Sequence, residues 1–115
     1  MSIKFDVWPL EILVSKNKIN KAAFYEFLDV DTMSAEIFEL PAGGKDTQKP
    51  HDWDELYYII SGKAQFMCDG ESQDVMTGDT IFVSAFLDHY FYDIEQDMKI
   101  LVVFSKKPPE QEDDL

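Results

Sequence analysis

Residues 49–62 read Lys-Pro-His-Asp-Trp-Asp-Glu-Leu-Tyr-Tyr-Ile-Ile-Ser-Gly, and this stretch decides how the rest of the chain is interpreted. It contains His51, one of only two histidines, and Glu55 four residues later. The two aspartates between them favour a turn, because such side chains bond to the nearby backbone. The apolar run after Glu55 is β-branched and aromatic, which is typical of a buried strand, and Gly62 predicts the turn that follows it.

Glu55 opens this apolar run, where a carboxylate is costly to bury unless a positive group pairs with it. If His51 and Glu55 hold one metal ion, each ligand atom lies ~2 Å from it, whereas four residues of straight strand span ~13 Å. The chain must therefore bend between them. In a metal-free arrangement, the ammonium of Lys49 would pair with Glu55 instead. Residues 49–62 leave both arrangements open.

Length and composition predict one domain with one core. The chain has 115 residues, of which 45% are hydrophobic and 14% aromatic. The N-terminus lacks the pattern of a signal peptide, and no run approaches the ~18 apolar residues of a membrane span. Cys68 is the only cysteine, which excludes an internal disulfide framework. These features predict a cytoplasmic, soluble protein.

The charge balance argues against two classes of partner. The formal net charge is −13, from 23 acidic and 10 basic residues. A field of this sign repels the phosphate backbone of nucleic acids and the surface of anionic membranes. We therefore expect neither nucleic acid nor membrane as a partner.

The spacing of strand-like runs predicts an all-β fold. Turn signals recur about every 8–12 residues and no clear helix is visible, as in an antiparallel sandwich or barrel. A double-stranded jelly roll satisfies this pattern. The runs are 22–28, 33–40, 56–60, 63–69, 71–76, 80–83, 89–94 and 98–104.

The two ends of the chain are expected to lie outside the barrel. Residues 5–14 are apolar and contain Pro9, which cannot donate to a β-ladder, so an edge strand or a lead-in arm is expected there. Residues 15–21 are polar and basic and predict a surface loop. A single domain thus covers residues 1–105, with 1–21 as arm and loop. The acidic segment 106–115 is expected to be disordered.

Two sequence patterns resemble the signatures of the cupin superfamily. His51, Glu55 and Gly62, with Gly43 ahead of them, resemble the first signature, G-x5-H-x-H-x3or4-E-x6-G. Residues 78–93 resemble the second, G-x5-P-x-G-x2-H-x3-N. In that second pattern Gly78 and His89 match, and the replaced positions are Ser84, Phe86 and Asp93. The resemblance implies a small stand-alone single-domain cupin with a double-stranded β-helix, or jelly-roll, barrel.

The resemblance also implies a metal site. In cupins the usual ligands would map to Lys49, His51, Glu55 and His89, but a protonated lysine offers no lone pair. It therefore implies His51, Glu55 and His89 as ligands of a divalent metal ion, Fe, Zn, Mn or Ni. Positions left open on the ion would take a small polar molecule for oxygenase, isomerase or lyase chemistry.

Two alternatives keep the question of an enzyme open. One is a metal-free small-molecule-binding module in which Lys49 pairs with Glu55, with no cofactor at all. The other is acid/base catalysis without metal, as in sugar epimerases of cupin fold, with a histidine as base and a tyrosine as acid. That mechanism needs a carboxylate to orient the histidine, and Asp88 or Asp93 is the local candidate.

The remaining assignments concern the walls of the site. We expect Lys49, Tyr57 and Trp53 to contact substrate, and Trp53 and Phe86 to close the mouth of the barrel. Cys68 is expected in the core, with nothing near it to lower its pKa. The resemblance implies a homodimer that exchanges residues 5–14. The phenylalanines expected in the core are Phe24, Phe38, Phe66, Phe82, Phe91 and Phe104.

Overall fold

A computed structural model describes residues 4–20 and 23–106, and it is built almost entirely of strands. All strand pairs are antiparallel, and the sheet order is β1-β2-β6-β3-β4, with β5 also paired to β3. The elements in chain order are α1 (Leu10–Asn20), β1 (Phe24–Asp29), β2 (Met33–Leu40), β3 (Glu55–Cys68), β4 (Glu71–Met76), β5 (Thr80–Val83) and β6 (His89–Ser105).

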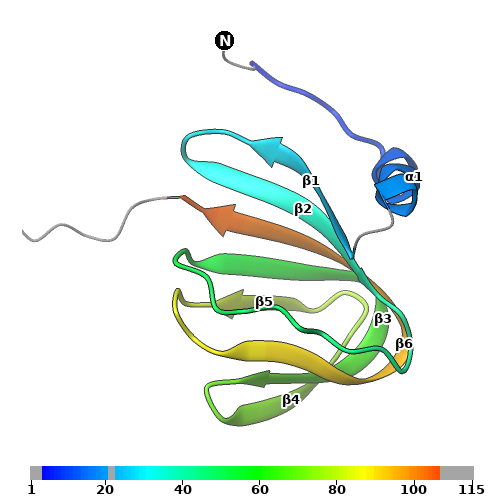
Figure 1. Ribbon diagram of the computed structural model, residues 1–115, viewed down its shortest axis with the longest axis vertical. Helices are drawn as coiled ribbons and strands as arrows, with labels where there is room; N and C mark the ends of the chain where they lie inside the picture. The colour runs from blue at the N-terminus through cyan, green and yellow to red at the C-terminus, as the bar shows by residue number, and fades with distance from the viewer. Residues whose placement is uncertain (1–3, 21–22, 107–115) are drawn as a thin grey trace, which may run out of the picture.

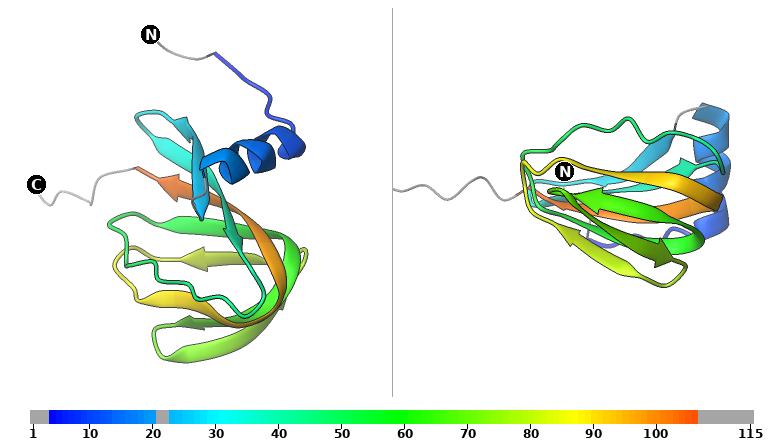
Figure 2. Two further views of the ribbon diagram at one scale, coloured as in Figure 1. Left: turned by 45° about the vertical axis from the view of Figure 1, so that its right-hand side comes forward. Right: turned by 90° about the horizontal axis from the view of Figure 1, so that it is seen from below.

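Two long strands fold this sheet over on itself. The first half of β3 pairs with the second half of β6, with Glu55 opposite Phe104, and the second half of β3 pairs with the first half of β6, with Cys68 opposite His89. The two halves of the sheet therefore face each other across the core (Figures 1 and 2). This is the predicted double-stranded jelly roll.

The bend of β3 is centred on Gly62. Its φ is 116°, and the pairing register with β6 shifts on both sides of it. The sequence predicted a turn that ends the strand at Gly62, but the strand continues through this residue and bends there. In the same way, residues 95–97 do not separate two strands, because β6 runs on without a break. Bends inside a strand leave a weaker sequence signal than turns between strands.

The core lies between the two halves of the sheet. Phe38, Phe66, Phe91 and Phe104 are buried there as predicted. Phe24 and Phe82 are exposed, so their assignment to the core was wrong. Phe24 lies on the outermost strand and Phe82 on the short β5, where an aromatic side chain satisfies strand propensity without being covered.

Residues 10–20 form a helix, whereas the sequence predicted an edge strand or lead-in arm over 5–14 and a surface loop over 15–21, of which residue 21 lies outside the described residues. α1 packs on β1 and β2, burying Leu13 and Asn17, and the Asn17 amide donates to Glu39 Oε1 at 2.8 Å. Pro9 precedes the helix, and its carbonyl accepts the amide of Ile12 at 3.0 Å. Proline is tolerated where a helix begins as well as at a sheet edge, so Pro9 did not distinguish the two.

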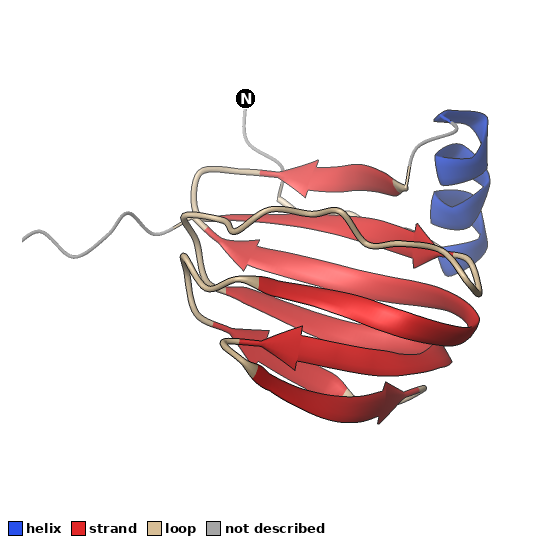
Figure 3. Cartoon of the chain, turned by 60° about the horizontal axis from the view of Figure 1, so that its bottom comes forward, coloured by secondary structure: helices blue, strands red, loops and turns tan. Residues whose placement is uncertain are grey.

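A long loop and the chain ends complete the fold. Residues 41–54 run from the bent end of the sheet to the opposite end, where β3 begins (Figure 3). Lys106, assigned to the tail, is ordered, because its amide donates to the Thr32 carbonyl at 2.9 Å. The rest of the predicted tail, 107–115, lies outside the described residues. Within 4–20 and 23–106, no helix has the length and apolar character to cross a membrane.

Candidate metal centre

The bends of β3 and β6 bring the first residues of both strands to one end of the barrel. Glu55 begins β3 in one half of the sheet and His89 begins β6 in the other. Both side chains point between the halves and are buried, with 2% and 4% of their surface exposed. The bend expected after His51 is also present at residues 52–53, and it brings His51 beside them.

The three side chains His51, Glu55 and His89 meet at one point. One potential ligand atom from each lies within 4.8 Å of the other two. The imidazole rings are 6.0 Å apart between centroids and tilted by 46°. The structure therefore brings together the three residues that the sequence patterns singled out, although 38 positions separate the second histidine from the first. Two imidazoles and one carboxylate are a donor set that Zn and Fe(II) both accept.

The hydrogen bonding of His89 shows how well this set fits a cation. Its Nδ1 lies 2.8 Å from the Leu87 carbonyl, which can only accept, so Nδ1 carries the proton. Nε2 then presents a lone pair toward Glu55 Oε1 at 2.8 Å. That contact lacks the alignment of a hydrogen bond, and both Nε2 and the second oxygen, Oε2, are buried without a hydrogen-bond partner. Two acceptors facing each other need a positive charge between them, and a metal ion supplies it.

A proton is the other way to satisfy this pair. Burial lowers the pKa of His89, but the contact with Glu55, the Leu87 carbonyl and the charge of Asp46 outweigh it and raise that pKa above its usual value. A protonated His89 would form a buried ion pair with Glu55. The residues therefore accommodate either a metal ion or an imidazolium at the same place.

Aromatic side chains fix the position of His51. Its ring packs edge-on against Phe104, with centroids 4.8 Å apart, and the Trp53 ring also packs edge-on against Phe104, with centroids 6.2 Å apart. The Lys106 ammonium lies 5.8 Å from the centre of the Trp53 ring and pairs with Asp29. Trp53 thus forms part of the wall beside His51, and its contact with substrate stays a prediction.

Tyr57 and the loop form a second polar wall, which includes a residue that sequence reasoning missed. The Tyr57 hydroxyl donates to Gln48 Oε1 at 3.0 Å, and the Gln48 amide donates to Asp46 Oδ2 at 2.7 Å. Burial and the charge of Glu55 raise the pKa of Tyr57 well above its usual value, so its hydroxyl stays protonated. Gln48 is half-buried, whereas the next residue, Lys49, is exposed. The only sequence signal for Gln48 was its place directly before Lys49, which occupies the position of the first histidine of the signature.

The expected ion pair between Lys49 and Glu55 does not form in the part of the chain that the structure describes. Glu55 faces His89 instead, and Lys49 lies on the solvent side of the loop. A lysine on its flexible stem gains more from water than from a buried site that already contains a histidine. In a metal-free state the partner of Glu55 is therefore His89, and the predicted pairing of Lys49 with Glu55 was wrong. The contact of Lys49 with substrate stays a prediction.

Three further predictions have mixed outcomes. Neither Asp88 nor Asp93 orients a histidine among residues 4–20 and 23–106, since His89 contacts Leu87 and Glu55. Burial, followed by nearby carboxylates, raises the pKa of the Cys68 thiol, in agreement with the expected inert cysteine. Phe86 has a φ of 70°, which explains why a glycine suits this position, and its ring is 63% exposed. That ring therefore does not narrow the barrel.

Glu36 is an unexpected carboxyl on the inner face of β2. It lies directly opposite Glu26 of β1, on the side of the sheet that also carries Phe38. Burial, the charge of Glu26 and the charge of Glu55 raise its pKa from 4.5 to about 7. An acid with a raised pKa in the folded state destabilises the protein when it is ionised, so the loss of stability begins above pH 4.5 and is complete above about pH 7.

Glu36→Gln should therefore stabilise the protein at high pH only. We expect a gain on the order of 1–2 kcal/mol at pH 8, less than the full linkage because the side chain is partly exposed. The gain should fall towards zero near pH 4.5. Urea unfolding at both pH values measures it. Glu26→Gln is the control and should gain less, because burial is the larger cause; a gain that does not change with pH would contradict this explanation.

Comparison with known proteins agrees with the fold and with the sequence patterns. The family model described as "Cupin domain" matches residues 36–104. An uncharacterized protein of Streptomyces coelicolor is 39% identical over 101 residues, which are 88% of this chain and 94% of that protein.

Solved structures give the same result at lower identity. A conserved Streptococcus pyogenes protein of unknown function has a TM-score of 0.64 and 25% identity, over 76% of this chain and 75% of its own. The DMSP lyase DddQ from Ruegeria pomeroyi has a TM-score of 0.69 and 22% identity, over 77% of this chain and 49% of its own. KdgF from Halomonas sp. has a TM-score of 0.66 and 18% identity, over 75% of this chain and 79% of its own. The last two likenesses concern the fold alone. The family match covers more than half of the chain, and the chain therefore belongs to the cupin family.

Proposed function

We propose that this protein binds one divalent metal ion through His51, Glu55 and His89 and uses it to bind a small polar molecule. The observation that carries the proposal is the pair of buried, unsatisfied acceptors, His89 Nε2 and Glu55 Oε2. One carboxylate and two imidazoles, from Glu55, His51 and His89, leave positions open on the ion for a ligand. Such an ion polarises an oxygen group of that ligand, as a Lewis acid.

The surrounding side chains would hold and orient the ligand. The Tyr57 hydroxyl donates its proton to Gln48, so its oxygen is fixed in place to accept a hydrogen bond from the ligand, and Phe104 and Trp53 give an apolar wall beside His51. A small molecule with an oxygen atom at one end and an apolar body fits this combination. Lyase, isomerase or oxygenase chemistry would follow from the metal and from the ligand. The likeness in fold to a DMSP lyase supports the view that this barrel shape suits small-molecule sites.

Elemental analysis tests the proposal. Protein purified without chelators should carry close to one Fe, Zn, Mn or Ni ion per chain. Metal-free protein should take up one equivalent of at least one of these ions, with a rise in melting temperature, because the ion binds only the folded state. Protein that arrives free of metal and takes up none of the four would exclude the proposal. It would favour the metal-free binding module, in which a protonated His89 pairs with Glu55.

We also propose that two copies associate and that the protein works in the cytoplasm. Phe5 and Val7 are 84% and 76% exposed ahead of α1, and the outer face of β3 and β5 exposes Leu56 and Phe82. Apolar arms and faces of this kind are covered when two copies dock. Light scattering should give twice the chain mass, and Phe5→Asp should lower the measured mass; a monomer at ~100 µM would contradict the dimer.

The free thiol of Cys68 supports the proposed location in the cytoplasm.

A further inference from the structure

One cavity lies at the edge of the barrel wall, between the long loop and the first half of β6. Two hydrogen bonds tie these segments together: the Gly43 amide donates to the Ile94 carbonyl at 2.9 Å, and the Phe91 amide donates to Asp46 Oδ2 at 2.9 Å. The cavity along them measures about 800 Å³. This volume is within the range of small-molecule sites. A Cβ atom on Gly43 would meet nothing within 4 Å, which shows how open this side is.

The cavity is separate from the candidate metal centre. Successive side chains of a strand point to opposite faces of a sheet. His89 and Phe91 point inward and are buried, whereas Tyr90 is 40% exposed and Tyr92 is half-buried on the outer face. A ligand in this cavity would contact the two tyrosines and would not contact the metal.

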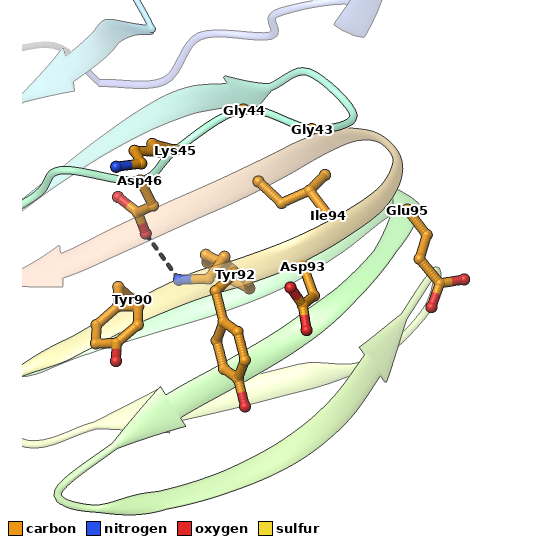
Figure 4. A pocket seen from close by; sticks show the side chains of 10 residues that line it. Gly43, Gly44, Lys45, Asp46, Tyr90, Tyr92, Asp93, Ile94 and Glu95 are labelled. Carbon is orange, nitrogen blue, oxygen red and sulfur yellow. Dashed lines mark hydrogen bonds between the residues drawn. The ribbon is translucent and has the colours of Figure 1, made fainter.

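The two tyrosines form a fixed aromatic surface. Their ring centroids lie 5.8 Å apart and the rings are tilted by 57°. The Tyr92 hydroxyl lies 2.6 Å from the Ser72 hydroxyl, which holds this ring in place. Figure 4 shows Tyr90, Tyr92 and the carboxylate of Asp93 extending to the same side of β6. Aromatic faces and a negative charge are therefore presented together.

The backbone at Asp93 is strained. Its φ is 47°, in the left-handed region that costs most residues on the order of 1–3 kcal/mol. Glycine would occupy this position without strain, and aspartate tolerates it better than most side chains. The strain places the Asp93 carboxylate on the same side of the strand as the neighbouring Tyr92 (Figure 4). Glu95, at the end of the cavity, is also exposed, but its carboxylate already pairs with the Lys63 ammonium at 3.6 Å, so Asp93 supplies the charge for a ligand.

We propose that this cavity binds a small organic cation of the alkylammonium class. Such a cation packs against the electron-rich faces of tyrosines. The Asp93 carboxylate provides the opposite charge, and the net charge of −13 draws cations to the whole surface. Lys45 lines the opposite side of the cavity and is the one cationic side chain in its lining. It repels the ligand and limits the affinity.

Titration with tetramethylammonium chloride tests the proposal. This probe has positive charge and no hydrogen-bond donors, so its binding reports on the rings and the carboxylate. We expect saturable shifts in the NMR amide signals of residues 43–46 and 90–95 at low ionic strength. Sodium chloride at equal ionic strength should give none. Absence of a saturable shift with tetramethylammonium would overturn the proposal.

Matched variants separate the contributions. Tyr92→Phe keeps the ring and should bind within twofold of wild type, whereas Tyr92→Leu removes it and should bind about fivefold more weakly. Asp93→Asn removes the charge but tolerates the same backbone conformation, and should weaken binding about fivefold with the melting temperature unchanged. Equal binding by both Tyr92 variants would show that no aromatic contact exists and would overturn the proposal.

Lys45→Met determines the sign of the ligand's charge. If the site binds cations, loss of the lysine should tighten tetramethylammonium binding about twofold to threefold, because a like charge is removed. If the site binds anions, acetate titrated into wild-type protein should give saturable shifts at the same residues, and Lys45→Met should abolish them. That second outcome would overturn the assignment to cations.

Discussion

Glu55→Gln should greatly weaken metal binding while leaving the barrel folded. The variant keeps the size of the side chain but replaces the one anionic ligand of the proposed centre with a neutral amide. Since Glu55 is almost fully buried beside His89 Nε2, no other carboxylate is in contact to replace it among the described residues. We expect the affinity for Zn(II) to fall by ~100-fold or more, which is about 2.7 kcal/mol. Competition with a chromogenic chelator measures this change.

The control for this prediction is Lys49→Met. Lys49 occupies the position of a signature histidine, yet it is exposed, so its replacement should leave the affinity within about twofold of wild type. His51→Asn should weaken binding strongly, though less than loss of the charged ligand. If Glu55→Gln binds zinc as tightly as wild type, the ion is held elsewhere on the chain and the proposed centre is wrong. If Lys49→Met loses binding instead, the loop must rearrange around the ion.

The strands and the three central residues could be predicted because their signals are local. Residues 33–40, 71–76 and 80–83 are strands with the predicted bounds, since turn residues flank each of them. His51, Glu55 and His89 were identified by their spacing relative to glycines. That spacing reflects a geometric need, because the bends of β3 and β6 must return both strand ends to one place.

The errors concern features that depend on distant parts of the chain. α1 has apolar residues but does not gather them on one face, so only its packing on β1 and β2 makes it stable as a helix. Whether the Lys49 side chain points inward or into solvent depends on its neighbours in the loop. The half-buried Gln48 accepts a hydrogen bond from Tyr57, and the next residue, Lys49, is left exposed. Phe82 has the composition of a core residue, but nothing in the described chain covers β5 on its outer face. Tertiary context decided each case.

Gly62→Ala should produce the largest loss of stability among the glycine variants. A Cβ atom at this position would lie 2.7 Å from the Asp97 carbonyl oxygen and 2.7 Å from Met98 Cα. Both are backbone atoms of β6, so neither can move without shifting that strand. Its φ of 116° adds the strain of a conformation that L-residues rarely adopt. We expect a loss of ~3–5 kcal/mol in the free energy of unfolding.

Gly70→Ala is the matched control, because it isolates the backbone term. Gly70 also has a positive φ, 82°, but a Cβ there would meet nothing within 4 Å. We expect this variant to lose only about 1 kcal/mol, and urea unfolding of both variants measures the difference. Equal losses would mean that β6 yields to the extra methyl group. A large excess for Gly62→Ala would mean that the close contact between β3 and β6 keeps the barrel bent, and with it the distance between Glu55 and His89.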